Sequence, residues 1–178
     1  MKTSIIEKHT FFETSIFKVG LISELLRSKS SRFLDELERW LSDNETILKQ
    51  FGLQEASRLS ILRNQLFVAK NKDIPQKRKH QMMEAAKCLE AAHTVLLGLH
   101  EPIKGKIQQG REAIQQILIL IKGQPAYQRN GQDSFNKHIK IVWAKLRADS
   151  QFSAVALQLQ TLLPEVDILR IIAEEIEL

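Results

Sequence analysis

The spacing of histidine and glutamate gives this sequence its most specific chemical pattern. Glu90 and His93 stand three residues apart, which on a helix places both side chains on one face. Helical bundles that bind two metal ions use this Glu-x-x-His pair, and they use it twice. The sequence has it once, and His93 falls among apolar residues. We therefore expect a buried neutral histidine, with no metal ligand, no cofactor and no catalytic residue in the chain.

A second histidine pattern lies close to Pro102. Histidine phosphotransfer domains are helical bundles with a His-x-x-Lys-Gly core, in which the lysine offsets phosphoryl charge. After His100, the lysine and the glycine come one position too late, as Lys104 and Gly105. After His93, Leu96 stands where the lysine belongs. A phosphotransfer or metal-binding bundle centred on His93 or His100 is therefore the weakest of the alternatives.

The sequence also lacks the local motifs of several large enzyme classes. It has no Walker loop, no Gly-x-Ser-x-Gly elbow, no His-Glu-x-x-His pair and no dinucleotide fingerprint. These motifs are independent of one another, so their joint absence favours a protein that is not an enzyme.

Composition predicts one helical domain over residues 1–178. A chain of 178 residues can bury one core, and 43% hydrophobic with 26% charged residues is close to the globular average. Only seven glycines and four prolines are present, too few for the frequent turns of an all-β protein. Apolar residues recur three and four positions apart along most of the chain, which indicates amphipathic helices.

These patterns predict an all-α, compact multi-helix bundle of about six or seven helices. The helix over 75–99 has apolar residues on more than half of its circumference, so we expect it to be central. Continuity of the helix over 31–51 stays open, because residues 42–45 read Ser-Asp-Asn-Glu, the spacing of a capping box. The expected helices cover residues 4–26, 31–51, 54–70, 75–99, 102–122, 134–148 and 150–176, the last interrupted by Pro164.

Prolines and serines suggest where several of these helices begin and end. Pro75 suits the first position of a helix, where its missing amide hydrogen costs nothing. Pro102 lies within an apolar helical pattern, and its ring would clash with the carbonyl of Gly98. We therefore expect the chain to break or kink there and to start a separate helix. Asp133 or Ser134 is the expected cap of the helix over 134–148.

Cysteine content and hydropathy point to a cytoplasmic protein. Cys88 is the only cysteine, so no disulfide can form within the chain. Charged residues interrupt the apolar start of the sequence before a signal peptide could form. The longest aliphatic run, Ile117 to Ile121, is far shorter than the ~20 residues that span a bilayer. The sequence predicts no membrane span.

Basic residues gather in the segment from 122 to 147. The net charge of the chain is +5, and in this segment Asp133 is the only acidic residue. A basic face with aromatic side chains nearby, here Tyr127 and Trp143, is typical of nucleic-acid contact. The candidate contact residues for nucleic acid or another anionic partner are Lys122, Arg129, Lys137, Lys140 and Arg147.

The absence of enzyme motifs and the uneven distribution of charge together favour a protein that acts by binding a macromolecule. The expected partner is another protein, in an adaptor, regulatory or chaperone-like role, and nucleic-acid binding through the basic face is the alternative. The C-terminal segment carries more isoleucine and leucine than one narrow stripe can hold. Its surplus apolar residues, if exposed, predict a homo-oligomer formed through the C-terminal helix.

Overall fold

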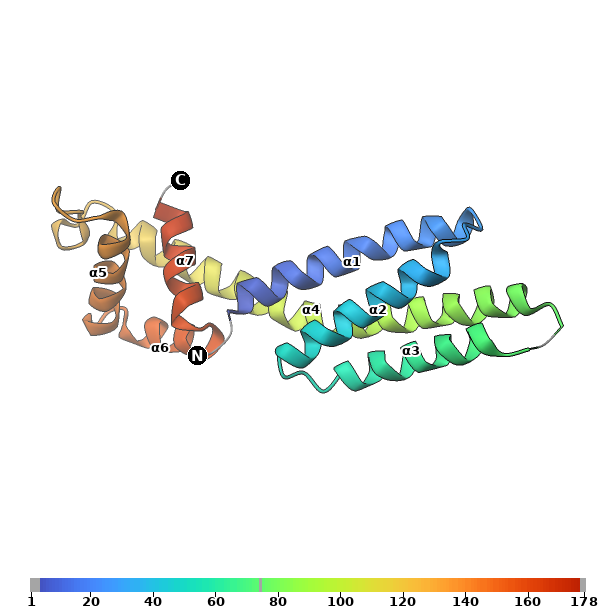
Figure 1. Cartoon of the computed structure of the whole chain (residues 1–178). Helices are drawn as coiled ribbons and strands as arrows, with labels where there is room; N and C mark the ends of the chain where they lie inside the picture. Colours follow the sequence, from blue (N-terminus) through green and yellow to red (C-terminus); the bar gives the residue numbers. More distant parts are fainter. Residues whose placement is uncertain (1–3, 74, 177–178) are drawn as a thin grey trace. The chain divides into compact units, whose positions relative to one another are not determined.

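The computed structural model describes residues 4–73 and 75–176, which form seven α-helices, one short 3-10 helix and no strand (Figure 1). The predicted all-α bundle is confirmed. The described residues divide into two compact units: unit 1 comprises residues 4–8 and 102–176, and unit 2 comprises residues 9–101 apart from residue 74. The single domain over 1–178 stays a prediction, because a unit of packing need not be a unit of folding.

Unit 2 contains four helical segments, which can be followed in Figure 1. They are α1 (Ile5–Arg27) from His9 onward, α2 (Phe33–Gln50), α3 (Ala56–Asn71) and α4 (Lys77–Ile121) as far as Glu101. Side chains three, four or seven residues apart point into its core and are fully buried. Among them are Phe12 of α1, Phe33, Leu37, Leu41 and Leu48 of α2, Leu59 and Leu66 of α3, and Ala92 and Leu96 of α4.

The helix α2 is continuous, which answers the question left open by the capping-box spacing. Asn44 is buried in the middle of α2, where its side chain accepts a hydrogen bond from Ser15 and donates one to the carbonyl of Trp40. Its polar atoms therefore join α1 to α2 instead of starting a new helix. The chain then turns into α3 at Gly52, whose φ of +69° is in the left-handed region that glycine adopts without strain.

The helix α4 runs without interruption through Pro102, so the expectation of two helices separated there was wrong. Proline removes one backbone donor and leaves the carbonyl of Gly98 without its helical partner. Both Pro102 and Gly98 are exposed, so water can bind that carbonyl and the helix continues. The expected first residue of this helix was also wrong. Gln76 has a φ of +55°, which no α-helix contains, and α4 begins after it.

One buried thiol lies where α3 and α4 pack. Cys88, on α4, is 3% exposed, and its Sγ lies 3.5 Å from the carbonyl oxygen of Leu62 on α3, to which it donates a hydrogen bond. Burial raises the pKa of this thiol, and the nearby Glu84 carboxylate raises it further. Cys88 is therefore a packed, protonated side chain at neutral pH.

Unit 1 is built around the second half of α4. The short 3-10 helix η1 (Pro125–Tyr127) follows it, and then α5 (Phe135–Ala148), α6 (Ser153–Leu162) and α7 (Glu165–Ile176). Of the two expected caps, Asp133 and Ser134, it is Ser134 that caps α5, since its side chain accepts a hydrogen bond from the amide of Lys137. The core of unit 1 joins α4, α5, α6 and α7; its fully buried side chains include Ile114, Trp143, Leu146, Leu159, Ile168, Ile171 and Ile172.

Most of the additional apolar residues of the C-terminal segment are buried in the core of unit 1. Ile168, Ile171 and Ile172 are fully buried, and the exposed apolar residues of α7 are Val166 and Ile176. Self-association through this helix stays a prediction, with a smaller exposed surface than the sequence suggests.

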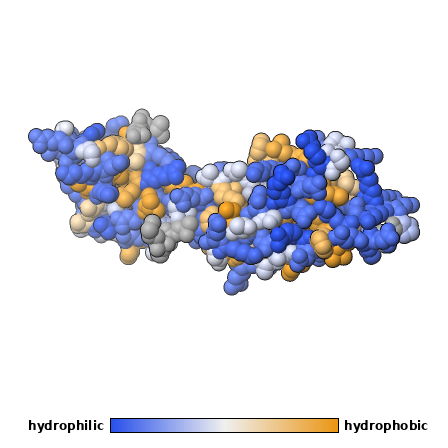
Figure 2. All heavy atoms as spheres, viewed as in Figure 1, coloured by the Kyte–Doolittle hydropathy of each residue, from blue (hydrophilic) through white to orange (hydrophobic). Residues whose placement is uncertain are grey.

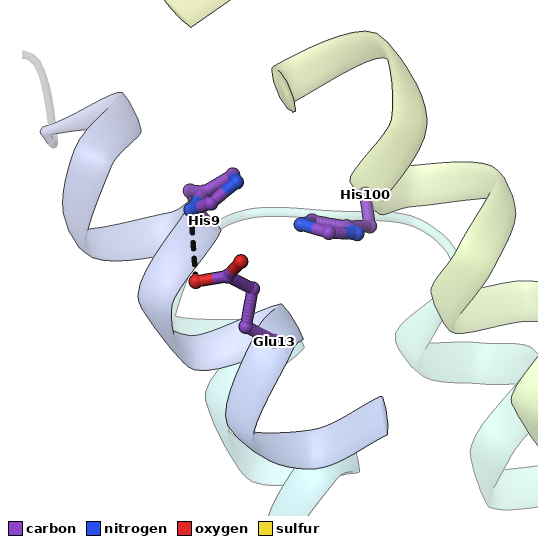
Figure 3. A group of neighbouring side chains, drawn as sticks. All are labelled: His9, Glu13 and His100. Atoms are coloured by element: carbon purple, nitrogen blue, oxygen red, sulfur yellow. Dashed lines mark ion pairs between the residues drawn. The ribbon is translucent and has the colours of Figure 1, made fainter. Parts of the chain in front are cut away.

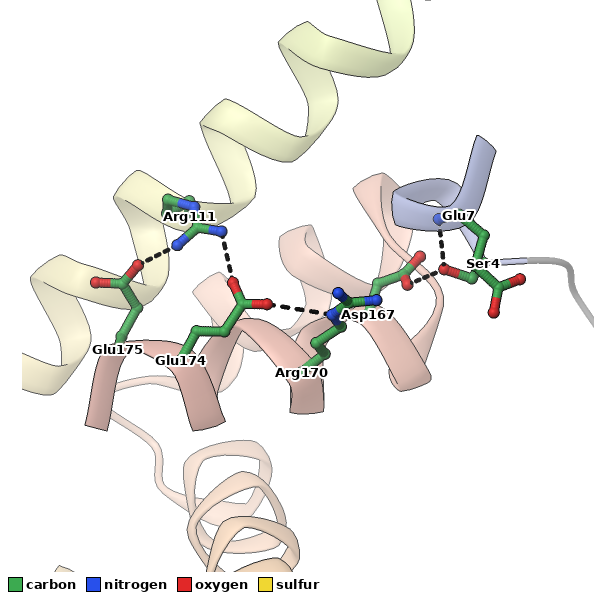
Figure 4. Close-up of polar contacts among 7 residues, drawn as sticks. All are labelled: Ser4, Glu7, Arg111, Asp167, Arg170, Glu174 and Glu175. Carbon is green, nitrogen blue, oxygen red and sulfur yellow. Dashed lines mark hydrogen bonds and ion pairs between the residues drawn. The ribbon is translucent and has the colours of Figure 1, made fainter. Parts of the chain in front are cut away.

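Two polar contacts close unit 1 (Figure 4). The buried carboxylate of Asp167 on α7 accepts a hydrogen bond of 2.5 Å from the hydroxyl of Ser4 and one of 2.6 Å from the amide of Ile5. Ser4 in turn accepts from the amide of Glu7, so it caps the first turn of α1. The negative charge of Asp167 therefore lies at a helix N-terminus, where it is stabilising. In the second contact, Arg111 of α4 holds two glutamates of α7.

The surface drawn in Figure 2 is mostly hydrophilic, with hydrophobic residues gathered in smaller patches. Among the described residues, no helix combines the length and the apolar character needed to cross a membrane. The most exposed large apolar side chains are Phe17 on α1 and Ile119 on α4, which are 73% and 71% exposed.

Candidate partner-binding site

A pocket of about 530 Å³ opens on unit 1, where the end of α4 meets α5 and α7. Volumes of this order are typical of ligand sites. Its apolar wall comes from three helices and its polar groups come mainly from the loop after α4. The lining residues are Gln115, Leu118, Ile119, Ile121, Lys122, Gly123, Gln124, Tyr127, Gln128, His138, Val142, Glu175 and Ile176.

The loop that borders the pocket has a fixed shape. Gly123 has a φ of +84°, which lets the chain leave α4 in a tight turn. The amide of Gln124 donates to the carbonyl of Ile121, and η1 follows directly. The hydroxyl of Tyr127 donates to the carboxylate of Asp149, and Lys145 donates to the carbonyl of Ala126. These contacts tie the loop to α5 and hold one wall of the pocket.

The acidic residue of the pocket wall is already neutralised. Glu175 accepts a hydrogen bond of 2.5 Å from Arg111 and one of 2.8 Å from Gln115. The adjacent Glu174 binds Arg111 and Arg170. Burial alone would raise the pKa of Glu174, but the hydrogen bonds from the two arginines outweigh that effect and lower it. Both glutamates are therefore occupied, and the exposed Lys122 supplies the charge that faces a ligand.

His138 contributes an uncharged imidazole to the pocket. Burial lowers its pKa from the ordinary value of 6.5, and the nearby Arg129 guanidinium lowers it further. The side chain is therefore neutral at pH 7. A neutral imidazole offers one hydrogen-bond donor and one acceptor to a polar group.

The predicted basic residues are exposed, but their surroundings differ. Arg129 donates to the backbone carbonyl of Asp133, and Lys137 pairs with the Asp133 carboxylate at 2.7 Å. Arg147 lies over the ring of Trp143, with 5.7 Å between the guanidinium carbon and the ring centroid. Lys140 and Lys122 are exposed, and Lys122 alone of the predicted set lines the pocket.

The two aromatic residues expected beside the basic face are inside unit 1. Trp143 is 1% exposed and Tyr127 is 9% exposed. Base stacking needs an open ring face, so neither residue can serve nucleic acid in that way. Trp143 lies at the edge of the apolar stripe of α5 in the sequence pattern, and packing of α5 in the core of unit 1 covers it.

The sequence pattern did not identify the pocket itself. Ile176 belongs to the apolar stripe of the C-terminal segment, whereas 36% of its surface is exposed; Ile119, which is 71% exposed, falls outside the apolar stripe expected for its helix. The sequence does show an excess of isoleucine in α4 and α7. That excess does not identify which isoleucine side chains are exposed on the surface.

Comparison of the chain with models of protein families, with curated proteins and with solved structures finds no match.

Proposed function

We propose that the protein acts by binding another protein, and that the pocket of unit 1 receives a short segment of that partner. The observation that carries the proposal is a pocket with an apolar wall that Lys122 also lines, and whose lining glutamate, Glu175, is paired with Arg111. Peptide recognition commonly combines one apolar anchor with polar contacts at the rim. The partner segment that fits has an aliphatic or aromatic residue next to aspartate or glutamate.

Charge supports an acidic partner. Lys122 lies at the pocket, and Lys137, Lys140 and Arg147 are exposed on α5 of the same unit. Positive charge around a docking site raises the rate at which an acidic segment meets it, more than it raises affinity. Lys122 then attracts the acidic segment, and the apolar wall of the pocket holds it.

A displayed library of random peptides tests the proposal on the full-length chain. We expect enrichment of peptides in which an apolar residue stands beside acidic ones. Ile119→Glu and Lys122→Glu should each weaken binding of an enriched peptide about tenfold or more, the loss expected at a central contact. Val166→Glu is the control, since Val166 is an exposed apolar residue of the same unit that does not line the pocket.

Two results would contradict the proposal. One is a library with no enriched peptide, or with peptides that bind the Ile119→Glu and Lys122→Glu variants as well as the unchanged chain. The other is tight binding of a fluorescent single-stranded DNA that falls steeply with salt and is lost when Lys137, Lys140 and Arg147 become alanine. That second result would establish the nucleic-acid alternative instead.

A further inference from the structure

Three side chains with metal-binding atoms come together in unit 2 (Figure 3). His9 and Glu13 are one turn apart on α1, and His100 reaches them from α4. One donor atom from each residue lies within 4.8 Å of the donor atoms of the other two. The two imidazole rings are 4.8 Å apart between centroids and are inclined by 45°.

One donor-donor distance in the cluster already equals that of a tetrahedral zinc site. Zinc binds imidazole nitrogen and carboxylate oxygen at about 2.0–2.2 Å, which places two ligands of one ion roughly 3.3–3.5 Å apart. The distance from Nδ1 of His9 to Oε2 of Glu13 is already 3.3 Å. The donor atom of His100 lies within 4.8 Å of the other donors, so binding would require it to move closer to them.

The surroundings match a site that is held on one side and open on the other. His100 is 7% exposed, and the ring of the fully buried Phe12 lies 6.3 Å from its ring, between centroids. The side chain of His9 is 20% exposed and that of Glu13 is 58% exposed. Packing therefore restricts the rings, while an ion can enter past Glu13 and a water molecule can complete its coordination.

His9 and Glu13 are neighbours on one helix and form an ion pair, whereas His100 comes to them from another helix. A second histidine from another helix, with its ring against the first, adds a ligand and no opposite charge. Two imidazoles and one carboxylate are ligands that zinc and similar transition metals prefer, whereas magnesium and calcium prefer oxygen alone.

We propose that His9, Glu13 and His100 bind one divalent transition-metal ion of the zinc type. This departs from the sequence-based expectation of no metal ligand. That expectation weighed the Glu90 and His93 pair, and the pairing of α1 with α4 that brings His9 to His100 is not visible in the sequence. The bound ion would cross-link the two helices and stabilise unit 2.

Titration of the full-length chain with zinc, followed by calorimetry, tests the proposal. We expect one ion per chain and a melting temperature that rises with zinc concentration. Cobalt in place of zinc should give the visible absorption of a tetrahedral site. His9→Asn and Glu13→Gln should each weaken binding at least about tenfold and lower the cobalt absorption. Both residues are partly or largely exposed, so the variants should keep their helical circular dichroism.

His80→Asn is the matched control, because His80 is also on α4 and does not belong to the cluster. It should bind zinc as the unchanged chain does. The proposal is wrong if the chain binds no stoichiometric zinc, or if the His9→Asn, Glu13→Gln double variant binds as tightly as the unchanged chain. These results concern unit 2 and leave the pocket of unit 1 untouched.

Discussion

In unit 1, the polar contacts that close the fold join residues far apart in the sequence: Ser4 binds Asp167, and Arg111 binds Glu174 and Glu175. In unit 2, most polar contacts join helices that follow one another. Ser15 of α1 binds Asn44 of α2, and Lys70 of α3 binds Glu38 of α2. Contacts between distant residues close longer loops and carry a larger entropic cost, which the packing of unit 1 must offset.

Each unit contains one tryptophan, which allows the two to be observed separately. Trp40 is in α2 of unit 2 and Trp143 is in α5 of unit 1; both are buried, and the sequence has no other tryptophan. With Trp40→Phe, fluorescence reports unit 1. With Trp143→Phe, it reports unit 2.

The largest effect is expected from Asp167→Ala. The change removes a buried carboxylate that accepts two hydrogen bonds, and it should lower the free energy of unfolding by about 3 kcal/mol. Asp167→Asn keeps an acceptor and should cost less. Urea unfolding followed at Trp143 measures both changes.

Urea unfolding of the same variants, followed by the fluorescence of Trp40, tests the prediction that the chain is a single domain. Because α1 and α4 contribute residues to both units, we expect Asp167→Ala to lower both urea midpoints together. A shift at Trp143 with none at Trp40 would mean that the two units are separate domains.

Two glycines of α4 should respond in opposite directions to alanine. A Cβ at Gly110 would lie 2.4 Å from Cδ1 of Leu163, a 2% exposed side chain that its own core neighbours hold in place. Gly110→Ala should therefore destabilise by about 1–3 kcal/mol. At Gly105 a Cβ meets nothing within 4 Å, so Gly105→Ala should stabilise by about 0.5–1 kcal/mol. Urea midpoints measure both; equal shifts would show that Leu163 yields to the new methyl group.

The smallest effect is a loss of stability in acid, centred on unit 1. His138 and Glu174 both have a pKa lowered by folding, so each group stabilises above its ordinary pKa and loses that contribution as the pH falls. The loss should begin near pH 6.5 for His138 and near pH 4.5 for Glu174. Unfolding at a series of pH values measures it. In His138→Gln the first decrease should disappear and the second remain; an unchanged first decrease would assign it to another group.

Local patterns predicted the helices well, because helix periodicity and capping depend on neighbouring residues. The cap at Ser134 and most helix ranges follow from spacing alone. The break at Pro102 was wrong, since the cost of a proline depends on whether water reaches the freed carbonyl. Contacts between helices could not be predicted from the sequence. The burial of Trp143 and the approach of His9 to His100 depend on which helix faces pack together, and hydrophobic periodicity does not identify the partner of a face.

The rate at which the buried thiol of Cys88 is chemically labelled reports opening motions of unit 2. The Cys88 thiolate attacks a thiol reagent, and at 3% exposure the sulfur becomes reachable only when α4 moves away from the carbonyl of Leu62. Since Cys88 is the only cysteine, every labelled chain records an opening at this one place. The labelling rate in the native state therefore reports every opening that separates α3 from α4, and a rate faster than global unfolding allows would reveal local opening.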